Sequence, residues 1–236
     1  MGVTGQNTSS AVMAQRHGHG ADLLDLFPTP CWATRALCDW LAVQFGPLHH
    51  FSCWEPAAGL GDMVRPLREY FRDVYASDVA EYRGGHDVVD FLWPSYRRAD
   101  FVVTNPPFKI AEQFIATALD RSSEGVAMLV RSAFLEGVGR HHRLFSRTPP
   151  MAVLQFTERV PMVKGRLDKE ATTATSYCWI VWRKNVATHR TQLVWLAPCR
   201  KRLERAEDYP AREFPAARAD DYDGGLNHDA APDPAD

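Results

Sequence analysis

Short apolar runs alternate with longer amphipathic stretches along most of the chain. The short runs are rich in β-branched and aromatic residues and end at Gly, Pro, Asp or Asn, which is typical of buried strands. We expect strands at residues 51–55, 73–77, 86–89, 101–105, 126–130, 151–156, 176–183 and 192–196. Apolar positions recur at helical spacing between several of these runs, which predicts helices at residues 30–43, 62–71, 109–122 and 136–145.

This alternation predicts an α/β fold, with a mostly parallel sheet, helices on both faces and ligands at the carboxyl ends of the strands. The last strands follow one another with little helix between them, so we expect the sheet to close with an antiparallel hairpin. A single domain over residues 23–205 accounts for the patterned part of the chain. Residues 1–22 and 206–236 are polar and unpatterned, and we expect both to be disordered.

The sequence Asn105-Pro106-Pro107-Phe108 follows the apolar run 99–104 directly. The two prolines end the strand and restrict the backbone beside the Asn105 amide. The side-chain carbonyl of Asn105 can accept hydrogen bonds, and Phe108 offers a flat apolar surface. These residues suit a site that grips the amino group of a planar substrate and stacks on its ring.

A loop with two glycines follows the first expected strand, ahead of a stretch that can form a helix. Gly59 and Gly61 would let a ligand approach the backbone closely, although the third glycine of the dinucleotide fingerprint is absent. Asp78 ends the next strand, where a carboxylate can accept hydrogen bonds from a ribose diol. Asp90 ends the third strand and precedes Phe91.

The order of these motifs, each at the end of a successive strand, resembles the S-adenosylmethionine-dependent N6-adenine DNA methyltransferases that carry an (Asn/Asp)-Pro-Pro-(Tyr/Phe) motif. Thr29-Pro30 resembles the motif that precedes the glycine loop in that family. The resemblance extends over residues 26–185. Residues 27–34 and the strand 177–182 are similar to small, phage-type members, which are linked to restriction-modification and to self-protection.

The resemblance implies a Rossmann-like methyltransferase fold, with a mostly parallel seven-stranded sheet and a terminal antiparallel hairpin. It implies S-adenosylmethionine as the cofactor, with Glu55 against the methionine ammonium, Asp78 against the ribose hydroxyls, and Asp90 with Phe91 at the adenine. The full set of cofactor-binding residues that it implies is Thr29, Pro30, Glu55, Pro56, Ala57, Gly59, Gly61, Asp78, Asp90, Phe91 and Asn105.

The implied substrate is an adenine flipped out of duplex DNA. Its amine is a poor nucleophile because the nitrogen lone pair is delocalised into the ring. The Asn105 side-chain carbonyl and the Pro106 backbone carbonyl would accept the two amine hydrogens and direct the lone pair at the methyl group. Phe108 would stack on the base. The implied catalytic residues are Asn105, Pro106, Pro107 and Phe108.

The net charge of −2 is unevenly distributed. Residues 206–236 hold nine acidic residues against two arginines, so the preceding part is basic. Basic residues gather at 131–147 and 183–205; such clusters are usually solvated surfaces, but we favour phosphate contact for at least one of them. Lys109, and Lys164 and Arg166 in the loop 160–175, are further candidates for DNA contact. That loop could equally be an unstructured connection.

Several classes of protein are disfavoured by the sequence. No apolar stretch approaches the ~20 residues of a membrane span, and the N-terminus lacks the features of a signal peptide. The five cysteines have no paired spacing and the nine histidines form no ligand pattern, so we expect buried thiols and no metal. We expect a protein of the cytoplasm of a bacterial or phage-infected cell, associated with the nucleoid.

The same motif chemistry leaves other substrates open. Methyltransferases of RNA adenine or guanine, and of a glutamine in release factors, also carry Asn-Pro-Pro-(Tyr/Phe), although the glutamine enzymes usually have Tyr and a longer N-terminal domain. A non-catalytic nucleic-acid-binding protein with this fold is a third reading. Few residues follow the strand 151–156, which favours a short DNA recognition sequence or recognition by a homodimer.

Overall fold

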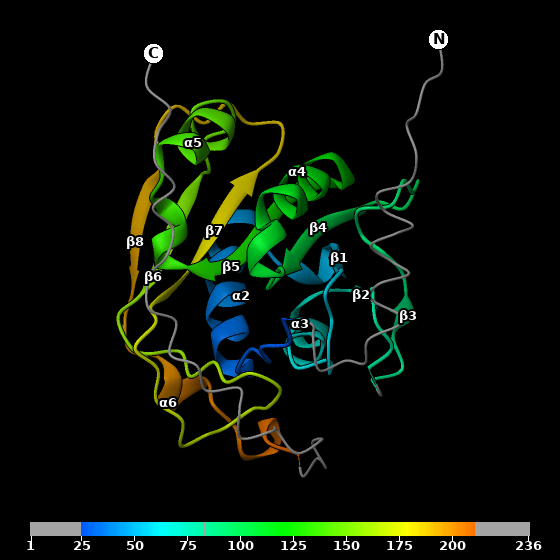
Figure 1. Cartoon of the computed structure of the whole chain (residues 1–236), viewed down its shortest axis with the longest axis vertical. Coiled ribbons are helices and arrows are strands. Elements are labelled where there is room, and N and C mark those ends of the chain that lie inside the picture. The colour runs from blue at the N-terminus through cyan, green and yellow to red at the C-terminus, as the bar shows by residue number, and fades with distance from the viewer. Residues whose placement is uncertain (1–24, 83, 211–236) are drawn as a thin grey trace, which may run out of the picture.

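The computed structural model describes residues 25–82 and 84–210, which form a twisted sheet covered by helices (Figure 1). The described sheet has eight strands in the order β3-β2-β1-β4-β5-β7-β6-β8. In chain order they are β1 Ser52–Glu55, β2 Asp73–Asp78, β3 Asp87–Val88, β4 Ala99–Thr104, β5 Ser122–Arg131, β6 Ala152–Phe156, β7 Tyr177–Arg183 and β8 Gln192–Leu196.

Strand directions confirm the predicted α/β fold. β3, β2, β1, β4 and β5 are parallel to one another, whereas β7 is antiparallel to both β5 and β6. The sheet therefore contains the expected antiparallel hairpin. It has one strand more than the seven expected, because β8 pairs in parallel with the outer edge of β6.

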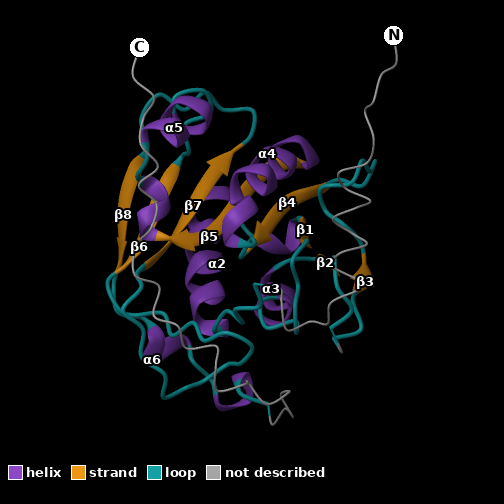
Figure 2. Cartoon of the chain, viewed as in Figure 1, coloured by secondary structure: helices purple, strands orange, loops and turns teal. Residues whose placement is uncertain are grey.

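Helices cover both faces of the sheet (Figure 2). The described α-helices are α2 Cys31–Phe45, α3 Val64–Tyr70, α4 Ala111–Arg121, α5 Val138–Arg140 and α6 Arg200–Leu203. Alternate residues of β4 point to opposite faces, as the pleat requires. Phe101 and Val103 are buried in the core with α2 residues, and Val102 is buried in the second core with Phe114 and Ile115 of α4.

The predicted helix at 136–145 is a shorter and irregular structure. α5 has only three residues and runs into a π-helix at His141–Phe145. Gly137, with φ +108°, precedes α5, and Gly139 lies inside it. Glycine disfavours a regular helix because it has the most backbone entropy to lose. The irregularity matters for function, because this segment follows β5 at the carboxyl edge of the sheet.

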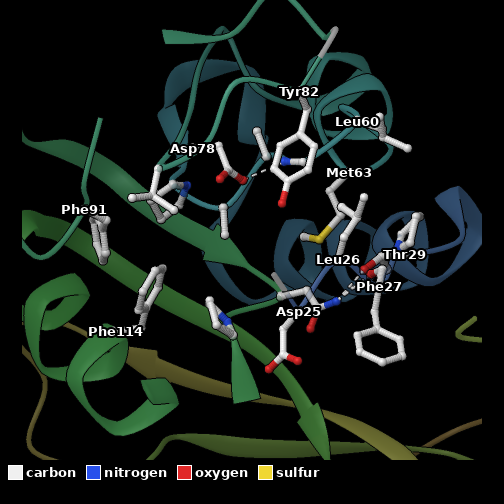
Figure 3. A pocket seen from close by; sticks show the side chains of 18 of the residues that line it. Asp25, Leu26, Phe27, Thr29, Leu60, Met63, Asp78, Tyr82, Phe91 and Phe114 are labelled. Carbon is white, nitrogen blue, oxygen red and sulfur yellow. Dashed lines mark hydrogen bonds between the residues drawn. The ribbon is translucent and has the colours of Figure 1, made fainter. Parts of the chain in front are cut away.

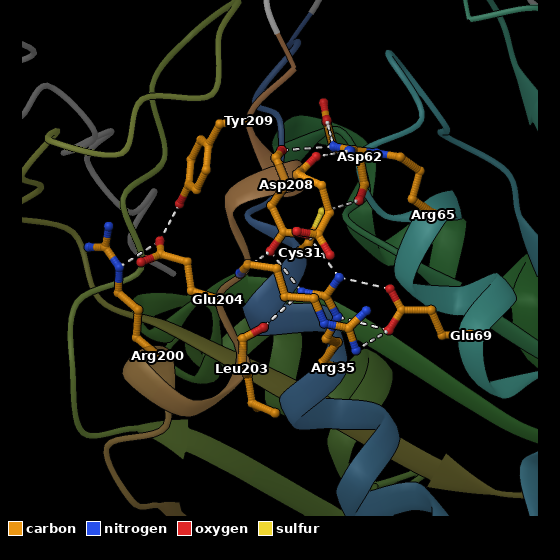
Figure 4. Close-up of polar contacts among 12 residues, drawn as sticks. Cys31, Arg35, Asp62, Arg65, Glu69, Arg200, Leu203, Glu204, Asp208 and Tyr209 are labelled. Atoms are coloured by element: carbon orange, nitrogen blue, oxygen red, sulfur yellow. Dashed lines mark hydrogen bonds and ion pairs between the residues drawn. The ribbon is translucent and has the colours of Figure 1, made fainter.

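The predicted C-terminal end of the domain, residue 205, is placed too early. Ala206–Asp208 form a 3-10 helix, and Asp208 is buried against the Arg35 guanidinium of α2 (Figure 4). The acidic composition of this segment suggested disorder, but one of its acids pairs with a buried cation. The segments 1–22 and 211–236, for which we predicted disorder, lie outside the described residues.

All five cysteines are buried and free. No helix of the described part is long and apolar enough to cross a membrane. A search of the same residues finds no group of three or more His, Cys, Asp or Glu side chains that could hold a metal ion.

Candidate active site

A cavity of about 550 Å³ opens beyond the carboxyl ends of β1, β2 and β4, where an α/β sheet places its ligand. Its volume lies within the range of small-molecule sites. Phe91 and Phe114 stand at one end, and Phe27 and Thr29 lie at the other (Figure 3). The cavity brings together ten of the predicted site residues from five separate segments: Thr29, Pro56, Ala57, Gly59, Asp78, Asp90, Phe91, Asn105, Pro107 and Lys109.

Asn105 lies directly after β4 and lines this cavity. Its Nδ2 donates to the Phe27 carbonyl oxygen at 3.0 Å and to Thr29 Oγ1 at 3.2 Å. Turning the amide over would place Oδ1 against the Phe27 carbonyl, which has no hydrogen to donate. The two contacts thus fix the amide orientation. Its Oδ1 is buried and has no hydrogen-bond partner among the described residues.

Phe108 lies at the edge of a second hollow of about 480 Å³, while Lys109 lines both this hollow and the main cavity. The Phe108 ring contacts Phe27 with centroids 5.2 Å apart, and the Arg131 guanidinium carbon lies 4.3 Å from its centroid. Phe108 lies three residues after Asn105 in the sequence, and the exposed side chain of Arg131 stacks on its ring.

Pro107 lines the main cavity, whereas Pro106 is buried and does not line it in the described structure. Pro107 accepts a hydrogen bond from the Ile110 N–H at 3.2 Å, in the 3-10 helix Phe108–Ile110 that leads into α4. The two prolines thus turn the chain sharply from the end of β4 into α4.

The two glycines of the loop after β1 have different roles. Gly59 has φ +50° and lines the cavity, and an added Cβ would lie 2.8 Å from Leu26 Cδ1. Gly61 has φ +83°, but an added Cβ would meet the His86 ring at 2.9 Å, and Gly61 is absent from the described cavity wall. Gly61 therefore makes room for His86 in the described structure, and its role in cofactor binding stays a prediction.

Asp78 and Asp90 line the same cavity from the ends of β2 and the β3 segment. Asp78 Oδ2 accepts from the Gly59 N–H at 2.9 Å, which ties the glycine loop to β2. Asp90 Oδ1 accepts from the Leu92 N–H at 2.9 Å. The Phe91 ring, next to Asp90, contacts Phe114 at a centroid distance of 5.0 Å, giving this end of the cavity an aromatic wall.

Glu55 is fully buried beneath the glycine loop, and the described cavity wall does not include it. Its Oε1 accepts from Thr104 Oγ1 at 2.5 Å and from the Ala57 N–H at 3.0 Å, which joins the ends of β1 and β4. Its Oε2 has no partner among the described residues. Burial raises the pKa of Glu55 to about 8, although the hydrogen bonds from Thr104 and Ala57 oppose the rise.

Pro30 is also outside the described cavity wall, because it caps α2. Lys164 and Arg166 are exposed in the long loop 157–176, and Arg166 pairs with Asp168 at 3.1 Å. The Gly165 N–H donates to the Leu26 carbonyl at 2.8 Å. This loop is thus attached to a segment that lines the cavity, although its two cations are outside the cavity wall.

The sequence did not point to several residues of the cavity wall: Asp25, Leu26, Phe27, Leu60, Met63, Tyr82 and Phe114. Most are apolar and fit the pattern of an ordinary core. The one available signal was the position of Phe27 next to the Thr29-Pro30 motif. Tyr82 lies in a loop without periodicity, so only the folded structure places it here.

Solved methyltransferase structures share this architecture. A protein assigned to the class I S-adenosylmethionine-dependent methyltransferases, from Listeria monocytogenes, matches with a TM-score of 0.52 at 14% identity, over 79% of this chain and 71% of that one. The methyltransferase subunit of a type I restriction-modification system from Streptococcus thermophilus matches with a TM-score of 0.56 at 13% identity, over 72% of this chain and 47% of that one.

A protein assigned as an RNA methyltransferase, from Pyrococcus horikoshii, matches with a TM-score of 0.53 at 17% identity, over 75% of this chain and 97% of that one. No protein-family model and no curated protein sequence matches the chain. The chain has the Rossmann-like fold of class I S-adenosylmethionine-dependent methyltransferases.

Proposed function

We propose that this protein transfers a methyl group from S-adenosylmethionine to the N6 amino group of an adenine flipped out of DNA. The observation that carries the proposal is the Asn105 amide. Its nitrogen is held by Phe27 and Thr29, its oxygen is buried without a described partner, and the residue lines a cavity of ligand size. A buried acceptor without a donor is costly, and a substrate amine would satisfy it.

The cavity fits the proposed cofactor. Asp78 and Asp90 would accept hydrogen bonds from its ribose and its adenine amine, with Phe91 and Phe114 against the ring. Gly59 has no Cβ, so the loop backbone and the Leu26 side chain can pack closely in the cavity wall. The unpaired Oε2 of Glu55 suits a positive ammonium at the methionine end. When bound, the cofactor supplies an electrophilic methyl group on a sulfonium.

The residues of this chain act on the amine. The Asn105 Oδ1 would accept one amine hydrogen, and the Pro106 carbonyl oxygen would accept the other. The Asn105 amide is held in place by Phe27 and Thr29 before the substrate arrives, so little reorganisation of this acceptor is needed on binding. The two acceptors would turn the nitrogen lone pair toward the methyl group that the bound cofactor would supply. The surplus amine proton would then leave to water.

We favour DNA over RNA because the motif order resembles the DNA adenine enzymes and because a restriction-modification methyltransferase shares the fold. A paired adenine can reach this cavity only by flipping, which costs a few kcal/mol. We extend the proposal to recognition of a short or relaxed DNA sequence, or recognition by a homodimer, and to action in the cytoplasm at the nucleoid.

The test is transfer of labelled methyl groups to unmethylated duplex DNA, single-stranded DNA and RNA. We expect label in DNA, and a loss of about 10²–10³-fold in kcat for Asn105→Ala, the size seen when one preorganised polar contact is removed. The matched control is Asn185→Gly, because Asn185 is an exposed amide at positive φ that donates to the Ser123 carbonyl, remote from the cavity.

Each possible outcome tests a different claim of the proposal. Cofactor affinity should be unchanged in Asn105→Ala if the amide acts on the substrate. Label only in RNA would keep the chemistry and overturn the DNA substrate. Full activity of Asn105→Ala would remove the proposed role of the amide, and failure of the wild-type protein to bind cofactor would leave a non-catalytic protein with this fold.

A further inference from the structure

Arg131 differs from the two other arginines beside the site, Arg140 and Arg143, because it forms no ion pair among the described residues. It is the last residue of β5, at the carboxyl edge of the sheet, and its side chain is exposed. Arg140 and Arg143 both pair with Glu112, and Arg140 also donates to two backbone carbonyls. Arg131 forms no ion pair with any carboxylate of the described chain; its guanidinium lies over Phe108 instead.

The contact with Phe108 is the second observation. The ring packs against the main core and contacts Phe27, which is half-buried and belongs to the same core, and the exposed Arg131 guanidinium lies over it. Phe27 is also held in place, because its carbonyl accepts from the Asn105 amide. Arg131 is exposed and is held by the ring and by a hydrogen bond to the Tyr177 hydroxyl, so it can move away from Phe108 more readily than Phe27 can.

Since the main core and Phe27 already contact this ring, a flipped base that stacks on Phe108 would take the place of Arg131. A guanidinium over a half-buried aromatic ring is in general held more weakly than a stacked base, so the exchange favours the base. The displaced cation then lies beside a flipped nucleotide and has no carboxylate to return to. The nearest groups of opposite charge are then the phosphate oxygens of the DNA strand that carries the flipped base. Arginine binds such oxygens in bidentate fashion.

We propose that Arg131 is a substrate-positioning residue: its guanidinium yields the Phe108 ring to the target base and binds a phosphate flanking the flipped nucleotide. The inference rests on the proposed function. It assigns DNA contact to one specific residue of the basic segment 131–147. It also couples the entry of the base to phosphate binding, because the base displaces the guanidinium that then binds the phosphate.

The experiment compares Arg131→Ala with Arg97→Ala as a matched control. Arg97 is likewise exposed and its guanidinium carbon lies 3.7 Å from the Tyr75 ring centroid, but it precedes β4 at the amino edge of the sheet. Both variants lose one cation and one ring contact, and only one lies beside the proposed site. The assay is methylation of unmethylated plasmid DNA over a range of salt concentrations, with cofactor binding measured separately.

We expect Arg131→Ala to raise KM for DNA about tenfold, as for the loss of one charged contact, with a smaller change in kcat and unchanged cofactor affinity. The dependence of log(kcat/KM) on log salt should become shallower by about 0.9, the value for one phosphate contact in duplex DNA. Arg131→Lys should restore the salt dependence because it keeps the charge, and Arg97→Ala should match the wild type.

A wild-type KM and salt dependence in Arg131→Ala would overturn the role of Arg131 while leaving the methyltransferase function intact. An equal change in Arg97→Ala would also overturn it, because the effect would then be general charge loss. If the wild-type protein methylates no DNA, the proposed function fails first, and this inference fails with it.

Discussion

At the scale of single residues, the site depends on how two buried oxygens are left unpaired. Asn105 Oδ1 is free because Phe27 and Thr29 occupy the amide nitrogen. Glu55 Oε2 is free because Thr104 and Ala57 both donate to Oε1. Each oxygen costs stability in the isolated protein and gains a partner when a donor arrives. The preorganised site therefore lowers the stability of the folded protein when no ligand is bound.

Glu55 leads to a prediction about pH and stability. Its pKa is about 8 in the folded protein against 4.5 for an ordinary Glu, because burial disfavours the charged form. Between these values the folded state holds a proton that the unfolded state releases. The stability contribution is therefore complete below about pH 4.5 and is lost as the pH rises to about 8. Denaturant unfolding across this range should show the decline, and Glu55→Gln should flatten it. A wild-type pH dependence in Glu55→Gln would contradict the assignment.

A second prediction concerns the cofactor. If an ammonium group meets Glu55, it favours the ionised carboxylate and lowers its pKa. Cofactor binding at pH 7 should therefore release a proton from Glu55. Calorimetry in buffers of different ionisation enthalpy measures this release directly. We expect it in the wild type and not in Glu55→Gln; binding without proton release in the wild type would separate Glu55 from the cofactor.

The residues that the sequence identified are those with a local signal. Asn105 stands between a strand and two prolines, and Asp78 ends an apolar run, so each is visible within a few residues. The stacking of Arg131 on Phe108 depends on β4 and β5 ending side by side, which no local pattern encodes. The contact between Gly61 and His86 has no sequence signal either, because a glycine that admits a ligand and one that admits a histidine ring look alike in sequence.

At the scale of elements, the loop between β1 and α3 contains a glycine, Gly59, that has a positive φ and also lines the cavity. We predict that Gly59→Ala costs about 1–2 kcal/mol through its positive φ and also weakens cofactor binding, because the new Cβ pushes Leu26 into the cavity. Gly46→Ala is the matched control: it has φ +87° after α2 and no atom within 4 Å of the added Cβ.

Thermal unfolding should show both glycine variants destabilised, and titration with cofactor should distinguish them. The expected outcome is reduced affinity in Gly59→Ala and wild-type affinity in Gly46→Ala. Equal affinity in the two variants would mean that the loop does not border the cofactor.

The elements themselves followed from periodicity, with exceptions that have physical causes. β4 and β5 each contain a continuous apolar run, at residues 101–103 and 126–130, and the pattern predicted both strands from these runs. The stretch 136–145 has helical periodicity, but two glycines and a π-helix interrupt it. β8 was expected as a strand, yet its parallel pairing with β6 depends on the path of the chain around the sheet edge.

At the scale of the whole molecule, a buried ion cluster ties the end of the described chain to the domain. Arg35 in α2 bonds to both carboxylate oxygens of Asp208, to the Leu203 carbonyl and to Glu69 in α3 (Figure 4). Arg35 and Asp208 are almost completely buried. The pairing is invisible in sequence, because the two residues are far apart and Asp208 belongs to an acidic segment.

We predict that Arg35→Ala lowers the free energy of unfolding by about 3–5 kcal/mol, since it leaves a buried carboxylate without its cation. The comparison is Asp73→Ala, which breaks the exposed Arg72–Asp73 pair and should cost at most about 1 kcal/mol. Chemical denaturation of both variants gives the two values. Equal losses would mean that Asp208 is solvated in solution.

The measurement that tests the central claim most directly is the identity of the methylated nucleoside. Unmethylated duplex DNA is incubated with the protein and S-adenosylmethionine carrying a deuterated methyl group, digested to nucleosides and analysed by mass spectrometry. The account predicts deuterated N6-methyladenine as the labelled product, and none with Asn105→Ala. Label on cytosine, or an unlabelled digest from a protein that binds the cofactor, would contradict it.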